Sequence, residues 1–147
     1  MIAMIAVGLG ASAQSGLEIN KIFGGKYSTD PTVTETLMSG DQKFLREHKL
    51  NTFATFKGKA NKYVPIIQPL VVADGSHARA RNVRYRDGKL HYAYYVLPPV
   101  TADGRSINRY LCYLNNEKAK NPSVMVIYFD GAISNEKAES LIKSIAK

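Results

Sequence analysis

The sequence predicts an α+β fold: an antiparallel sheet of about five or six strands, with N-terminal and C-terminal helices packed on one face. Two observations lead to this class. Short β-prone runs bounded by turn residues follow one another along most of the chain. Helical spacing of apolar residues is confined to the two ends and one central segment. Strands therefore succeed strands, which disfavours a parallel sheet of alternating strands and helices.

The start of the chain predicts a signal peptide. Residues 1–10 are apolar and uncharged, and Ala11-Ser12-Ala13 forms a small-x-small cleavage pattern. An apolar run of about ten residues is too short to span a bilayer. We therefore expect removal of residues 1–13 and export of a single α+β domain, residues 14–147, to the periplasm or the extracellular space. No Lys or Arg precedes Lys21, so a leader truncated at its N-terminus and a buried N-terminal helix or strand both stay open.

The next elements follow from capping and periodicity. Residues 15–18 match a capping box and start a short helix, which the glycine at Gly24 ends. The runs 32–38 and 50–56 are rich in β-branched and aromatic residues and predict strands. The charged segment 41–49 is ambiguous.

A central helix and the C-terminal elements follow. Apolar residues recur at helical spacing over residues 60–73, although Pro65 and Pro69 oppose a regular helix there. Two strands are predicted over residues 107–114 and 123–129. The second of these is apolar at nearly every position, which is typical of a central strand covered on both faces. A final helix begins after Ser134, a good capping residue.

The clearest local signal is a β-hairpin. Asp87-Gly88 stands between the β-prone runs 79–86 and 89–97, and both turn residues accept positive φ. Pro98 is expected to end the second strand. In a two-residue loop Arg86 would pair with Lys89. Tyr85 would then pair with Leu90, Arg84 with His91 and Val83 with Tyr92. A one-residue change in the turn would invert part of this register.

This register divides the hairpin side chains between two faces. The face expected in the core holds Val83, Tyr85, Leu90, Tyr92 and Tyr94. The face expected in solvent, which is the candidate binding surface, holds Arg84, Arg86, Lys89, His91 and Tyr95.

Charge is concentrated in the same region. The chain has 20 Lys and Arg against 12 Asp and Glu, a net charge of +8, and the segment from Ser76 to Tyr110 carries +5 of it. Arginine suits an oxyanion because its planar fork bonds bidentately. An anionic glycan, a lipid phosphate or a protein of the cell envelope would fit, and nucleic acid is the least expected partner of an exported protein. The competing interpretation is an ordinary solvated sheet face.

The residues with catalytic or metal-binding chemistry show no recognisable pattern. Cys112 is the single cysteine, which excludes an intramolecular disulfide and a four-cysteine zinc site and favours burial in the core. The three histidines, His48, His77 and His91, lie far apart without metal-ligand spacing. We therefore predict no catalytic residues, no metal and no cofactor.

Four segments carry a resemblance to a known family. They are Gly16 to Tyr27, Tyr94 to Pro99, Asn108 to Asn116 and Ile127 to Gly131. The chain resembles an uncharacterised family of small exported proteins from Gram-negative gut anaerobes, known only as a domain of unknown function. The resemblance implies export and a single domain, and it implies no site residues.

Taken together, the sequence favours a non-enzymatic exported binding or interaction domain that engages an anionic ligand through the basic hairpin face. A small envelope hydrolase or transferase, with a site assembled from distant residues, is the alternative. A subunit of an envelope assembly is a third possibility, which an exposed apolar patch would support.

Overall fold

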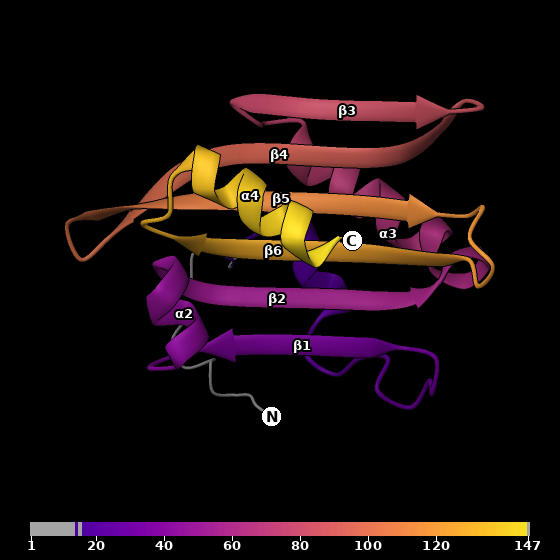
Figure 1. Cartoon of the computed structure of the whole chain (residues 1–147), viewed down its shortest axis with the longest axis horizontal. Helices are drawn as coiled ribbons and strands as arrows, with labels where there is room; N and C mark the ends of the chain where they lie inside the picture. The colour runs from indigo at the N-terminus through magenta and orange to yellow at the C-terminus, as the bar shows by residue number, and fades with distance from the viewer. Residues whose placement is uncertain (1–13, 15, 147) are drawn as a thin grey trace.

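The protein is built on a single six-stranded antiparallel sheet in the order β1-β2-β6-β5-β4-β3 (Figure 1). The computed structural model describes residue 14 and residues 16–146, so the leader expected at residues 1–13 lies outside the described part. The strands are β1 (Thr34–Ser39), β2 (Leu50–Lys59), β3 (Ala80–Arg86), β4 (Lys89–Ala102), β5 (Arg105–Asn116) and β6 (Ser123–Gly131). The helices are the 3-10 helix η1 (Glu18–Ile22), α2 (Lys43–His48), α3 (Ala60–Gly75) and α4 (Asn135–Ile145). The predicted α+β class and antiparallel sheet are confirmed.

Helices cover both faces of this sheet, so the prediction that the terminal helices share one face is not confirmed. Helices α3 and η1 pack on one face, here called the α3 face, and α4 and α2 pack on the other, the α4 face (Figure 1). The reason is visible in β6, where Ile127 belongs to the α4-face core and the adjacent Tyr128 to the α3-face core. Successive strand residues point to opposite faces, so consecutive apolar residues need cover on both sides.

Each face has its own apolar core. On the α3 face, Ile19 and Ile22 of η1 and Tyr63, Ile67 and Val71 of α3 pack on the sheet. The α4-face core is made by α4, α2 and the sheet, and its fully buried members include Leu45, Cys112, Ile127, Phe129 and Ala138. Cys112 is thus a core residue, as predicted.

The hairpin of β3 and β4 follows the predicted register only next to its turn. Arg86 pairs with Lys89 and Tyr85 with Leu90, as expected from the Asp-Gly turn. The register then shifts, because a β-bulge places His91 opposite no single partner and pairs Arg84 with Tyr92. Beyond the bulge every β4 side chain lies on the face opposite to the predicted one.

Strand β4 is longer than predicted because it does not end at the two prolines. It continues to Ala102, and its pairing with β5 shifts between Leu97 and Val100, which accommodates Pro98-Pro99 as an irregularity. The strand ends at a second Asp-Gly turn, Asp103-Gly104, in which both residues have positive φ. Helix α3 likewise contains both of its prolines and still runs to Gly75.

Gly75, at the end of α3, allows the helix to approach the sheet closely. A Cβ atom at this position would lie 2.3 Å from Cζ of the buried Tyr95. We therefore expect Gly75→Ala to lower the free energy of unfolding by about 1–3 kcal/mol, because overpacking outweighs the better helix propensity of alanine. Urea denaturation measures the change. The same substitution should cost less in a Tyr95→Ala background, and an unchanged stability of Gly75→Ala itself would contradict the packing described here.

Within the described residues, the longest helix is α3, and none of the helices combines the length and apolar character needed to cross a membrane.

Candidate functional site

A groove lies on the α4 face, where α4 ends and leaves the margin of the sheet uncovered. Its volume is about 350 Å³. Residues from β2 to β6 and the end of α4 line it: Lys57, Arg84, His91, Tyr92, Leu114, Asn115, Asn116, Ser123, Met125, Ile145 and Ala146. We call this surface the basic groove.

Three basic side chains from three different strands border the basic groove. Lys57 lies on β2, Arg84 on β3 and His91 on β4. Lys57 and Arg84 are exposed, and neither forms an ion pair with any residue of the described chain. None of the described residues that line the groove is acidic. The positive charge of Lys57 and Arg84 is therefore not neutralised by an ion pair within the described chain, and the acidic residue that acts on the groove at longer range is Glu139 of α4, near Tyr92.

The sheet holds Lys57 and Arg84 at the two ends of one cross-strand row. Lys57 pairs with Met125, Met125 with Leu114 and Leu114 with Tyr92, which in turn faces Arg84. The Arg84 guanidinium lies over the Tyr92 ring, with Cζ 5.4 Å from the ring centroid. This cation–π contact orients the guanidinium without using up its hydrogen-bond donors.

The floor between the cations is partly apolar and partly polar. Leu114, Met125 and Ile145 supply apolar surface, and Asn116 and Ser123 supply hydrogen-bonding groups. A floor of this kind, with cations at its rim, suits an oxyanion attached to a less polar body, such as a sulfated sugar ring or a phosphate headgroup.

The structure brings together only part of the predicted binding surface. Arg84 and His91 line the groove. Arg86 and Lys89 lie with His91 around a small dent at the tip of the hairpin, where Lys89 is 3.7 Å from a carboxylate oxygen of Glu117. The placement of Tyr95 in this surface was wrong: it is buried on the α3 face against Gly75, because the bulge at His91 reverses the direction of the residues that follow.

Lys57 and Tyr92 were missed in the sequence. Tyr92 was assigned to the core by the uninterrupted register, and the bulge moves it to the face that carries Arg84. Lys57 is a single lysine on a strand far along the chain, and it reaches the groove only through the order β2-β6-β5-β4. Its one local signal is a charged residue between apolar strand positions.

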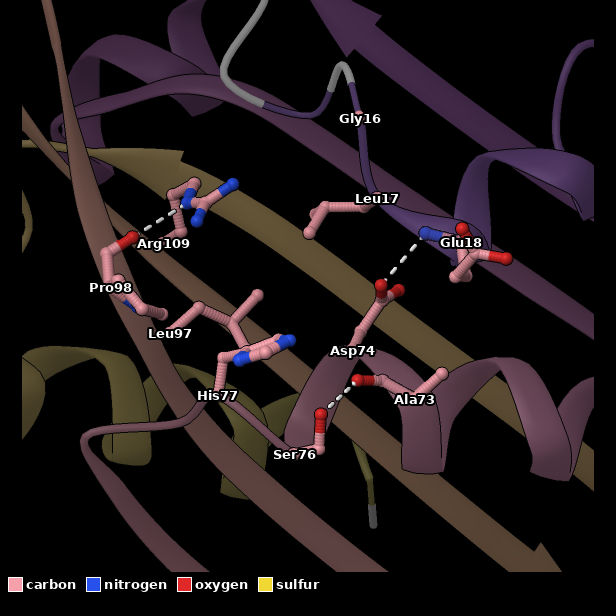
Figure 2. A pocket seen from close by; sticks show the side chains of 10 residues that line it. All are labelled: Gly16, Leu17, Glu18, Ala73, Asp74, Ser76, His77, Leu97, Pro98 and Arg109. Carbon is pink, nitrogen blue, oxygen red and sulfur yellow. Dashed lines mark hydrogen bonds between the residues drawn. The ribbon is translucent and has the colours of Figure 1, made fainter.

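A second hollow, of about 540 Å³, lies on the α3 face beside the N-terminal segment (Figure 2). It is bordered by the segment from Gly16 to Glu18, the end of α3 near Asp74, and Pro98 and Arg109 of the sheet. We call it the N-terminal hollow. Arg109 donates through Nε to the carbonyl oxygen of Pro98 at 2.8 Å, which fixes its side chain at one end of the hollow (Figure 2).

Asp74 fastens the N-terminal segment to this hollow. Its Oδ1 accepts a hydrogen bond from the backbone N–H of Glu18 at 2.7 Å, and its Oδ2 accepts one from Ile19 at 2.9 Å. A carboxylate from a distant helix thus caps η1, whereas the side chain of its own capping residue, Leu17, makes no such bond. Burial raises the pKa of Asp74, and these two hydrogen bonds oppose that rise.

A buried carboxylate, that of Asp130, lies close to the same hollow. Asp130 on β6 is 1% exposed and pairs in register with Arg109 on β5. The Tyr128 hydroxyl donates to Oδ2 of Asp130 at 2.6 Å, and Oδ1 has no hydrogen-bond partner. Burial raises the pKa of Asp130 to about 6, although Tyr128, Thr52 and the charge of Arg109 favour the ionised form.

The N-terminal hollow joins residues far apart in the sequence, as an enzyme site assembled from distant positions would. Both carboxylate oxygens of Asp74 are, however, engaged by the backbone of η1. We therefore assign Asp74 to holding the N-terminal segment. In the part of the chain that the structure describes, no three His, Cys, Asp or Glu side chains are grouped so that they could hold a metal ion.

Comparison with known proteins places the chain in a family without assigning it an activity. No curated protein and no solved structure matches it. The sequence profile of a family of unknown function matches residues 6–142, which is nearly the whole chain. The chain therefore belongs to the family of unknown function DUF6108.

Proposed function

We propose that this protein is an exported, non-enzymatic binding domain that holds an oxyanion-bearing ligand in the basic groove. The observation that carries the proposal is the meeting of Lys57, Arg84 and His91, from three strands, around one groove without a described acidic residue. The apolar leader at residues 1–13 supports export.

The shared chemistry of the ligand is a sulfate, phosphate or carboxylate group on a larger body. Such groups are abundant on acidic glycans and on lipid headgroups of the cell envelope. The groove offers one bidentate donor, Arg84, and one flexible point charge, Lys57, at the two ends of a cross-strand row. Binding should weaken steeply with salt, because exposed charge contacts are screened.

The test compares the double variant Lys57→Glu/Arg84→Glu with the control Lys43→Glu/Lys137→Glu. Both change the net charge equally, and the control glutamates fall in the first turns of α2 and α4, where negative charge is tolerated. Affinity is measured for dextran sulfate and for vesicles of phosphatidylglycerol, with phosphatidylcholine vesicles as the neutral reference.

We expect the groove variant to lose about tenfold or more in affinity for at least one anionic probe, and the control to lose much less. Preference for dextran sulfate would identify a glycan as the source of the anion, and preference for phosphatidylglycerol a lipid. Equal losses in both double variants would show that only the bulk charge of +8 matters, and the proposed site would then be rejected.

A further inference from the structure

One of the two outermost strands, β3, is an open edge of the sheet. It pairs only with β4, and no other described strand lies against its outer side (Figure 1). Six of its seven side chains are exposed and Val83 is half-buried; Tyr85 is 67% exposed. Its sequence, ARNVRYR, contains no Pro, Gly or acidic residue. Its outward backbone groups are therefore available for pairing with another strand.

Four arginines lie along this edge of the sheet. Arg79, Arg81, Arg84 and Arg86 lie on or directly before β3, and none of them forms an ion pair with a residue of the described chain. Arg81 donates through Nη2 to the carbonyl oxygen of Ala78, a local contact that leaves the charge uncompensated. Like charge on an edge repels a second copy of the same strand, and it attracts an acidic one.

From these features we propose that β3 docks an extended acidic peptide segment, which adds to the sheet as a seventh strand. This surface shares Arg84 with the basic groove but otherwise uses the outer edge of β3, whereas the groove lies on a face of the sheet, and the proposal does not depend on the groove. Backbone hydrogen bonds would supply the pairing, and alternate side chains of the peptide would meet the arginines.

The register of β3 specifies the pattern of the peptide. Arg84 and Arg86 point to the α4 face, whereas Val83 and Tyr85 point to the α3 face, which they share with Arg81 at the start of the strand. A strand beside β3 should therefore carry acidic residues on one face and β-branched or apolar residues on the other, because cross-strand neighbours on one face interact. At about 3.3 Å per residue, a peptide of about seven residues covers the edge.

The probe is a seven-residue peptide of alternating Glu and Thr, with blocked termini and a fluorescent label. Two further versions carry backbone N-methyl groups, one on the odd residues only and one on every residue. Both keep the charge of the peptide; the first keeps an unmethylated N–H row that can face β3 in one of the two peptide directions, whereas the second keeps none.

We expect the fully N-methylated peptide to bind about tenfold or more weakly than the unmethylated one in fluorescence polarisation at low salt, and the odd-methylated one to lose less. Equal affinities of the fully methylated and unmethylated peptides would mean that charge alone holds the peptide, and would overturn strand addition. Arg86→Glu, on the α4 face of β3 and outside the basic groove, should weaken binding of the peptide, whereas Lys57→Glu, which alters only the groove, should not. If Lys57→Glu weakened binding and Arg86→Glu did not, the peptide would occupy the groove, and the edge proposal would be wrong.

Discussion

Replacing Asp130 by Asn should stabilise the protein at pH 7.5 and leave its stability at pH 4 nearly unchanged. Burial raises the pKa of this carboxyl to about 6, against about 3.9 in an unfolded chain. The folded state therefore binds the Asp130 proton more tightly than the unfolded chain does. The contribution of Asp130 to the free energy of unfolding is fully present below about pH 4. This contribution is lost as the pH rises through 6, and the free energy of unfolding falls by about 3 kcal/mol.

Asparagine removes this loss because it stays neutral. Its amide oxygen can accept the Tyr128 hydrogen bond, and its nitrogen replaces an Oδ1 atom that has no partner. Urea denaturation of both proteins from pH 4 to pH 8 isolates the contribution of Asp130, because every other titrating group is common to the two. If Asp130→Asn were instead less stable at pH 7.5, the contacts of the carboxylate with Thr52 and Arg109 would outweigh the cost of burial.

The thiol of Cys112 should be almost unreactive in the folded protein. The residue is fully buried beneath α4, and burial raises its pKa to about 12. A free cysteine has a pKa of about 8.5, so the thiolate fraction at neutral pH falls by about a thousandfold, and exclusion of the reagent slows the reaction further. Labelling with a disulfide reagent before and after addition of urea measures this.

The control is Cys112→Ala/Ser106→Cys, which moves the only cysteine to an exposed position on the same strand. This variant should react at the rate of a free thiol in the native state. Rapid labelling of native Cys112 would show that α4 does not stay packed on its face of the sheet.

The sequence predicted the elements that form through contacts between residues close together in the chain. The Asp87-Gly88 turn and the two pairs next to it were found, because a two-residue loop of this type fixes the register at its ends. The final helix was found because Ser134 caps it, accepting a hydrogen bond from the backbone N–H of Lys137.

Features that depend on the assembled sheet could not be predicted. The bulge at His91 has no turn residue to mark it, and it moved Tyr92 to the groove and Tyr95 to the opposite core. Helices lie on both faces because both sides of β6 are buried. A continuous apolar run predicts this burial, but it does not indicate which helix covers which side. The cap that Asp74 gives to η1 joins residues 56 positions apart, and no local pattern reports such a contact.

Lys57, Arg84 and His91 are proposed to line one groove that binds an anionic ligand. The most direct measurement is a titration of the isotope-labelled protein with tripolyphosphate, followed through its backbone amide resonances. We expect the largest shifts to cluster at these three residues and their strand neighbours, and to vanish in Lys57→Glu/Arg84→Glu. Shifts centred elsewhere, for example at Arg109 in the N-terminal hollow, or spread evenly over all basic residues, would contradict this proposal.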